Sequence, residues 1–237
     1  MQPGNVLLTL LPTYTFLSDF MKRIFLLLGS TLLLTGTAQA QAGLRVGGSL
    51  SRFNNSTGNY IYHNSSGSLL GYQVGLYYQV SLGKHLSLVP EVQFSRERMT
   101  LTRYTSDITD GGLNADYRER FSYLNVPVLL RLALGPVYVE AGPQASYLLG
   151  GRETGTVVAG GFAGTTVYTV DREVINRYRR WDVGPSIGVG VQLPAGVGLN
   201  VRAYQGLASL PHDSEANTGH LYRKSLQVSL TYQLPGH

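Results

Sequence analysis

The sequence predicts an all-β fold: an eight-stranded antiparallel up-and-down transmembrane β-barrel with short periplasmic turns and long extracellular loops. Composition is the first observation, since the 237 residues include 29 glycines, 16 tyrosines, no cysteine and only 14% charged residues. A chain rich in tyrosine and poor in helix-favouring runs is typical of a β protein. The second observation is an alternation of apolar and polar residues in segments of about ten residues, a length that crosses a bilayer at a tilt. The third is that short and long connections alternate along the chain, as in bacterial outer-membrane barrels.

The clearest alternation lies in residues 69–93, where two segments are joined by a tight turn at 82–84. Successive side chains of a strand point to opposite faces, so this hairpin has one apolar face and one polar or small face. The apolar face of its first segment consists of Leu70, Tyr72, Val74, Leu76, Tyr78 and Val80. A soluble sandwich or barrel would show the same local pattern, so the rest of the chain must decide which face meets solvent.

Six further alternating segments complete the expected set of strands. They lie at residues 44–51, 117–132, 137–147, 182–193, 197–204 and 225–234. The long connections between strands are expected to be loops at residues 54–67, 104–114, 150–180 and 209–222. An even number of strands, with short turns at one end and long loops at the other, favours an outer-membrane barrel.

The apolar face is predicted to point outward, toward lipid. It carries no charged residue over 70–80 or 226–234, and a charge at the bilayer midplane would cost about 2–4 kcal/mol. The opposite face is rich in glycine, serine, glutamine and asparagine, with few and balanced charges. Buried charges are tolerated when they are paired, so these residues are expected to form a charge network in the lumen. The predicted network consists of Arg45, Glu91, Arg131, Glu140, Asp182 and Arg202.

A pore is not expected, because eight strands enclose a space that side chains can fill. Two interfacial belts of aromatic residues are predicted on the outer face, since Tyr72 and Tyr78 would lie about 20 Å apart along one strand. The other members of the belts would be Phe94, Tyr147, Trp181 and Tyr232. The alternative is that these are ordinary surface or core aromatics.

Four prolines fall inside the expected strands: Pro90, Pro127, Pro143 and Pro185. Proline cannot donate to a ladder and a closed barrel has no edge strand, so β-bulges are the expected accommodation.

The N-terminal region predicts a secretory signal peptide at residues 21–40. A basic Met21-Lys22-Arg23 precedes an apolar stretch at 24–34 and a small-x-small pattern at Ala38-Gln39-Ala40. The stretch is shorter than the roughly 20 residues of a membrane-spanning helix; the alternative is a buried core helix. Residues 1–20 do not fit a signal and are interpreted as a mis-assigned extension, with translation starting at Met21. Residues 41–237 would then form the barrel domain.

Three strands carry a resemblance to a known family. Residues 123–131, Tyr-Leu-Asn-Val-Pro-Val-Leu-Leu-Arg, resemble the Tyr-Leu-x-Ile-Pro-Leu-Leu-Leu-Lys pattern of the PorT-like outer-membrane β-barrel family, common in Bacteroidota. Residues 137–149 and 182–190 are similar to the strands that follow it. The resemblance implies the fold, the bacterial outer membrane and the barrel assembly machinery as a partner, but no single activity. PorT itself is linked to protein secretion, which makes secretion-system proteins possible partners. One departure is the C-terminus, which continues past Tyr232 to Pro235-Gly236-His237, whereas many such barrels end on an aromatic residue.

The sequence predicts no catalytic, cofactor-binding or metal-binding residues. None of the histidines is placed with a serine and a carboxylate in a spacing that indicates a nucleophile and its base. A metal site at His212, Asp213, Glu215 and His220 is an alternative, although such loops are more often simply solvated. A formal net charge of +5 is too mild to indicate nucleic-acid binding, so no nucleic-acid partner is predicted.

The last part of the 150–180 connection is basic and aromatic, and it suggests a rim that contacts lipopolysaccharide phosphates. Its candidate residues are Arg172, Arg177, Arg179 and Arg180. Arginines suit such charge-assisted contacts; the alternative is a solvated strand extension whose charges pair internally.

The sequence therefore favours a monomeric outer-membrane barrel with a packed polar lumen, surrounded by lipid and lipopolysaccharide, with a structural or surface-binding role through its extracellular loops. The alternative is an accessory component of protein secretion or transport. A barrel enzyme is a distant third.

Overall fold

The computed structural model describes residues 40–55, 63–107, 111–161, 164–208 and 221–235, and nine antiparallel strands lie in them. The strands are β1 (Ala40–Asn55), β2 (His63–Ser81), β3 (Leu86–Asp107), β4 (Gly111–Leu134), β5 (Val137–Gly161), β6 (Gly164–Glu173), β7 (Trp181–Gln192), β8 (Val197–Gln205) and β9 (Leu221–Gln233). Two short 3-10 turns, η1 (Ile175–Arg177) and η2 (Pro194–Gly196), precede β7 and β8. The predicted signal peptide and N-terminal extension fall almost wholly outside the described residues and stay predictions.

Eight of these strands close into a ring, which confirms the predicted fold class. The ring runs β1–β2–β3–β4–β5–β7–β8–β9, and β9 pairs with β1 to complete it. All of these pairings are antiparallel, and each strand pairs with the next one in the ring. Closure leaves the ring without an edge strand.

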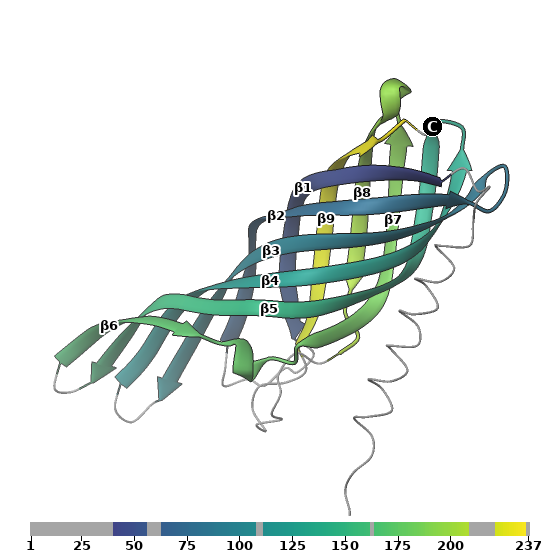
Figure 1. Cartoon of the computed structure of the whole chain (residues 1–237). Coiled ribbons are helices and arrows are strands. Elements are labelled where there is room, and N and C mark those ends of the chain that lie inside the picture. Colours follow the sequence, from purple (N-terminus) through teal and green to yellow (C-terminus); the bar gives the residue numbers. More distant parts are fainter. Residues whose placement is uncertain (1–39, 56–62, 108–110, 162–163, 209–220, 236–237) are drawn as a thin grey trace, which may run out of the picture. The chain divides into compact units, whose positions relative to one another are not determined.

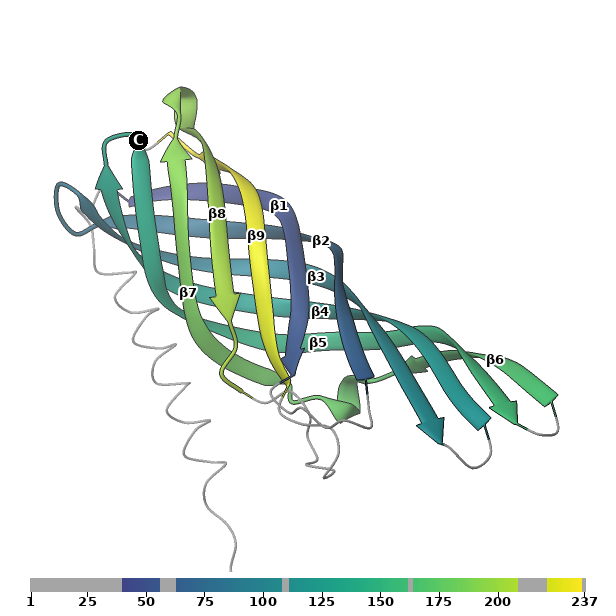
Figure 2. The same ribbon diagram turned by 180° about the vertical axis from the view of Figure 1, so that it is seen from behind.

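The ninth strand, β6, was not predicted, and the strands at one end are longer than expected. β6 pairs with the distal part of β5, from Arg152↔Glu173 to Gly161↔Gly164. Figures 1 and 2 show the distal parts of β3, β4 and β5 continuing beyond the ring with β6, and we call this extension the arm. The prediction of loops at 104–114 and 150–180 is wrong for most of these residues, because a composition rich in glycine and threonine is typical of loops and carries only weak strand signals. Pairing between neighbouring strands supplies the backbone hydrogen bonds there.

Tight connections lie at the opposite end of the ring. The chain turns at residues 82–85 between β2 and β3, at Gly135-Pro136 between β4 and β5, and through η2 between β7 and β8. Gly135 and Gly196 have φ values of 72° and 79°, which glycine adopts without a steric penalty. Among the described residues, no helix is long and apolar enough to cross a membrane.

The prediction of β-bulges at the prolines is wrong. The register of β3 with β4 is the same on both sides of Pro90, and the β4–β5 register is the same on both sides of Pro127. Pro143 of β5 lies opposite Pro185 of β7 without any shift. A missing proline donor therefore interrupts individual hydrogen bonds and leaves the register intact. The register shifts instead occur at Leu69/Tyr72 in the β2–β3 ladder and at Ser122/Tyr123 in the β4–β5 ladder.

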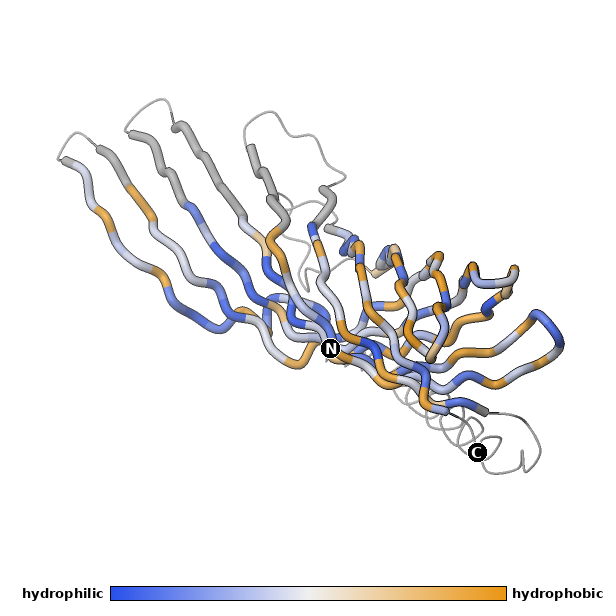
Figure 3. The backbone as a smooth tube through the Cα atoms, turned by 90° about the horizontal axis from the view of Figure 1, so that it is seen from above, coloured by the Kyte–Doolittle hydropathy of each residue, from blue (hydrophilic) through white to orange (hydrophobic). Residues whose placement is uncertain are grey.

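Apolar side chains cover the outside of the ring, as predicted. On β2, Leu70 is 69% exposed and Leu76 is 63% exposed, whereas Gln73 is fully buried. Figure 3 shows the same alternation of hydrophobic and hydrophilic residues along the strands. The ring is therefore turned inside out relative to a soluble protein, with its polar side chains in the core.

Candidate functional site

A cluster of charged side chains crosses the lumen near the end with the tight turns. Arg45 of β1 lies 3.0 Å from Glu91 of β3, and Arg202 of β8 lies 3.1 Å from the same carboxylate. Glu140 of β5 lies 2.9 Å from Arg131 and 2.7 Å from Arg202. Every one of these side chains is 5% exposed or less. We call these five residues the lower network; they are five of the six that the sequence grouped together.

Neutral groups complete the lower network. Asn200 accepts a hydrogen bond from Arg45 at 2.7 Å and donates one to Glu140 at 3.1 Å. The Arg131 guanidinium lies 4.1 Å from the centre of the Tyr138 ring, a cation–π contact. Three arginines share two carboxylates, so the Asn200 side-chain oxygen and the face of the Tyr138 ring help to stabilise the third positive charge.

Asp182, the sixth predicted member, lies apart from the lower network. Its carboxylate accepts a hydrogen bond from the Tyr204 hydroxyl at 2.9 Å and one from the Ala208 backbone at 3.2 Å. It is paired by neutral donors and not by an arginine of the lower network.

A second buried ion pair, missed by the sequence analysis, lies nearer the arm. Arg223 of β9 donates from Nε to Glu97 of β3 at 3.0 Å, and its Nη2 bonds the other carboxylate oxygen. The guanidinium also lies 4.0 Å from the ring centre of Tyr123. Glu97 shares its parity with Glu91, and Arg223 shares its parity with the inward-facing Ser225, so extending the alternation by a few residues would have found both.

Uncharged polar side chains fill the layer between the two ion-pair clusters. Gln73 donates to Ser229 at 2.7 Å, and Gln93 in turn donates to Gln73. Asn125 donates to Ser95 at 2.9 Å. The lumen therefore holds packed side chains from one charged cluster to the other.

Glycines make room for the large lumen side chains. A Cβ atom added at Gly43 would collide with the ring of Tyr77, and one added at Gly190 would collide with the ring of Tyr138. Inward-facing glycines therefore accommodate bulky neighbours at these two positions.

The segment that follows β6 packs over the arm end of the lumen. Val174 is buried and its backbone N–H donates to Gly151 at 3.0 Å. The Tyr178 ring meets Phe121 edge-on with centroids 5.1 Å apart, and its hydroxyl donates to Glu119 at 3.0 Å. This contact covers an apolar cluster that also contains Met99, Tyr123 and Leu148.

The predicted arginine rim divides into different environments. Arg172 is bound to Glu153 at 2.6 Å, an internal pair of the arm. Arg180 donates to the Tyr147 hydroxyl at 3.4 Å. Arg177 and Arg179 are exposed.

Tyr72, Phe94, Tyr147 and Trp181 lie on the outer wall of β2, β3, β5 and β7 at the arm end of the ring, and we call them the aromatic band. Tyr72 pairs in register with Gly48 of β1 and Arg96 of β3, and its ring lies 6.4 Å from Phe94. Phe94 is opposite Leu124, which is opposite Tyr147, and Tyr147 lies 4.7 Å from Trp181. Tyr78 and Tyr232 lie near the other end of the ring, opposite Ala42 and Leu44 of β1. The aromatic residues therefore lie in two groups toward opposite ends of the ring, and their assignment to membrane-interface belts stays a prediction.

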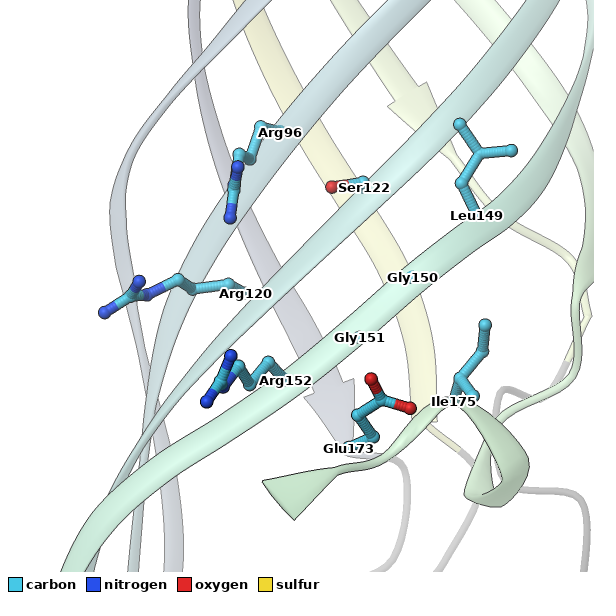
Figure 4. Close-up of a pocket in the computed structure, with 9 residues that line it drawn as sticks. All are labelled: Arg96, Arg120, Ser122, Leu149, Gly150, Gly151, Arg152, Glu173 and Ile175. Atoms are coloured by element: carbon cyan, nitrogen blue, oxygen red, sulfur yellow. The ribbon is translucent and has the colours of Figure 1, made fainter. Parts of the chain in front are cut away.

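Arginines lie on the outer wall directly beyond this aromatic band. Arg96 of β3, Arg120 of β4 and Arg152 of β5 surround a cavity of about 250 Å³, together with Ser122 and Leu149. Figure 4 shows the three arginines extending to the same side from three neighbouring strands. No pattern in the sequence predicted this group.

The predicted absence of a metal site is not tested by this structure. In the described ranges, no three histidine, cysteine, aspartate or glutamate residues are grouped as metal ligands. The alternative site at His212, Asp213, Glu215 and His220 lies outside the described residues. His85 is exposed at the turn between β2 and β3.

Comparison with solved structures gives low similarity to small barrels. Ail, the attachment invasion locus protein of Yersinia pestis, is 9% identical with a TM-score of 0.39, over 82% of this chain and 99% of that one. Neisserial surface protein A is 10% identical with a TM-score of 0.43, over the same shares. The outer membrane protease OmpT from Escherichia coli is 9% identical with a TM-score of 0.36, over 82% of this chain and 96% of that one.

No curated protein matches the sequence. The family model described as "Outer membrane protein beta-barrel domain" matches residues 37–211, most of the chain. This match agrees with the closed ring, its apolar outer wall and its polar core. The chain therefore belongs to the outer membrane β-barrel domain family and is a multi-pass barrel of the bacterial outer membrane.

Proposed function

We propose that this protein is a non-conducting outer-membrane barrel that anchors the arm at the cell surface as a binding platform. The observation that carries the proposal is the buried lower network, in which arginines of β1, β4 and β8 meet carboxylates of β3 and β5 across the lumen. Charges this deeply buried hold their positions only while they are paired. A solute would have to break several of these pairs to pass.

The arm supports the second half of the proposal. Its strands continue past the aromatic band and leave the ring, so they lie beyond the apolar wall (Figure 2). Val167 and Tyr168 of β6 are 61% and 48% exposed. Exposed apolar and aromatic groups on a strand are suited to contacts with another molecule.

Planar-bilayer recording of the purified protein tests the closed lumen. We expect no stable conductance steps, and a matched variant with Arg45→Ala and Arg202→Ala, which empties part of the lower network, is expected to leak. Heat-modifiable gel mobility shows whether that variant has formed a barrel. Large stable steps from the unaltered protein would overturn the proposal.

Trypsin treatment of intact cells tests the exposed arm. We expect cleavage after Arg118 or Arg172, which are exposed, while the ring itself stays protected. Fragments cut only after permeabilisation of the outer membrane would place the arm in the periplasm and would contradict a surface platform.

A second candidate function is an accessory role in protein secretion, and the resemblance of residues 123–131 to the PorT-like family supports it. Crosslinking in cells separates the two functions, because a secretion accessory is expected to crosslink to secretion components in the periplasm or membrane.

A further inference from the structure

Four arginines form one group on the outer wall of β3, β4 and β5. We call Arg96, Arg98, Arg120 and Arg152 the arginine cluster. Arg96 and Arg98 have the outward parity of Phe94, while the intervening Ser95 and Glu97 are fully buried. Arg120 is exposed between the buried Glu119 and Phe121, and Arg152 is exposed beside the buried Glu153. The cluster therefore stands on the same surface as the apolar wall that faces lipid.

The strand register places three of these charges side by side. Arg98 lies opposite Arg120 in the β3–β4 ladder, and Arg120 lies opposite Arg152 in the β4–β5 ladder. Like charges directly opposite each other destabilise a sheet. An anion bound between them would turn this repulsion into attraction.

The protein supplies only part of the compensating charge. Asp171 binds Arg152 through two contacts of 2.7 and 2.8 Å, and Glu173 lines the neighbouring cavity. Within the described part of the chain, Arg96, Arg98 and Arg120 form no ion pair with a carboxylate. Four positive charges thus face two negative ones.

The cavity beside the cluster has room for a charged group, and one of its sides is apolar. Its volume is about 250 Å³, and part of its lining is the backbone of Gly150 and Gly151, which have no side chains to fill it. Leu149 and Ile175 give it an apolar side, and Ser122 adds a hydroxyl (Figure 4). A phosphate fits the charged side, and a lipid chain fits the apolar side.

We propose that the arginine cluster binds the phosphate groups of an outer-leaflet glycolipid. Arg96 is two residues beyond Phe94, a rise of about 7 Å, and the aromatic band marks the level of the membrane interface. Lipid phosphates lie just outside this level. Arginine binds phosphate through two parallel N–H donors, which adds geometric specificity to the charge attraction.

The position on the wall favours a lipid over a soluble anion. Below the cluster the outer wall is apolar, with exposed Val92, Leu124 and Leu130 on β3 and β4. A lipid whose phosphate lies in the cluster can therefore lay its acyl chains along this wall. A soluble anion would gain nothing from these side chains.

The test uses the full-length protein in detergent micelles, with lipopolysaccharide as the probe and calorimetry or fluorescence as the readout. The double variant Arg98→Gln/Arg120→Gln is expected to bind at least tenfold more weakly. The control Lys84→Gln, which removes an exposed positive charge at the turn between β2 and β3, is expected to bind within twofold of the unaltered protein. Heat-modifiable mobility confirms that each variant is folded.

Two further probes identify the recognised group. Dephosphorylated lipopolysaccharide is expected to lose the same affinity as the double variant, and inorganic phosphate alone is expected to bind far more weakly than the lipid. Unchanged binding in the double variant, or equal binding of the dephosphorylated lipid, would overturn the proposal. Inorganic phosphate that bound as tightly as the lipid would also overturn it, because the site would then serve a soluble anion. A closed lumen is measured by conductance and does not depend on this outcome.

Discussion

Arg223 and Glu97 join two strands that are separated in the ring by β1 and β2. Their contact spans 126 positions of sequence, and both side chains are fully buried. The guanidinium is held further by the rings of Tyr123 and Tyr204. The ion pair therefore ties the wall of the barrel together across its interior.

Removing one member of this pair is expected to destabilise the barrel strongly. Glu97→Ala leaves a buried guanidinium without its carboxylate, a change that typically costs about 3–5 kcal/mol. The measurement is urea unfolding in detergent, followed by the fluorescence of Trp181, the single tryptophan of the chain. The double variant Glu97→Leu/Arg223→Met is expected to recover part of the loss because it leaves no unpaired charge. A single variant as stable as the unaltered protein would contradict the role of the pair.

Within the lower network, Glu140 is expected to matter more than Glu91. Glu140 lies within 4 Å of Arg131, Arg202 and Arg45, whereas Glu91 contacts Arg45 and Arg202. Glu140→Gln therefore removes the charge that three arginines share, while Glu91→Gln removes one that two share. We expect the lower urea midpoint for Glu140→Gln. The reverse order would show that the contacts to Arg131 contribute little.

Substitution of a lumen glycine on β7 is also expected to destabilise the barrel. A methyl group at Gly190 would collide with the Tyr138 ring, which also carries the cation–π contact of Arg131. Gly190→Ala is expected to lower the free energy of unfolding by about 1–3 kcal/mol, as overpacked cores do. Combining it with Tyr138→Ser removes the collision with the ring and leaves only the close contact with the Leu199 carbonyl oxygen, so the two changes are expected to be less than additive. Strict additivity in this double-mutant cycle would show that the ring simply moves aside.

Alternation along the strands was enough to predict the ring, the outward apolar face and all five residues of the lower network. These features depend on side-chain parity, which the sequence displays directly. Asp182 has the right parity but lies at a different height, beside Tyr204. Parity gives the face on which a side chain lies but not its position along the barrel axis, because that position depends on the register between strands.

The arm and the arginine cluster could not be predicted for a related reason. Arg98, Arg120 and Arg152 come from three strands, and the register shift between Ser122 and Tyr123 in the β4–β5 ladder sets Arg120 opposite Arg152. Such shifts depend on local backbone geometry, and β-bulges of this kind occur at barrel rims. The sequence shows the arginines but not their alignment.

The aromatic band predicts where Trp181 lies in the membrane. Its indole is 49% exposed on the outer wall and packs on Tyr147 at the arm end of the ring. In vesicles of brominated lipids, its fluorescence is expected to be quenched most by bromine near the headgroups and least by bromine at the bilayer centre. As a matched control, a tryptophan placed by Val189→Trp on the same strand is expected to show the opposite order in a Trp181→Phe background. Strong quenching of Trp181 from the bilayer centre would contradict the position of the band.

The exposed pair in the arm gives a prediction about pH. A hydrogen bond from Arg152 and its nearby positive charge hold the pKa of Asp171 below its ordinary value. A carboxyl group with a lowered pKa in the folded state stabilises that state above its ordinary pKa and ceases to do so as the pH falls through the lowered value. The pairing of β6 with β5 is therefore expected to loosen only in acid, and only slightly, because both side chains are exposed. Carbon-detected NMR titration of Asp171 measures the shift, and Arg152→Gln is expected to return the pKa toward its ordinary value. An unchanged titration in this variant would show that the close contact of the two side chains is not maintained in solution.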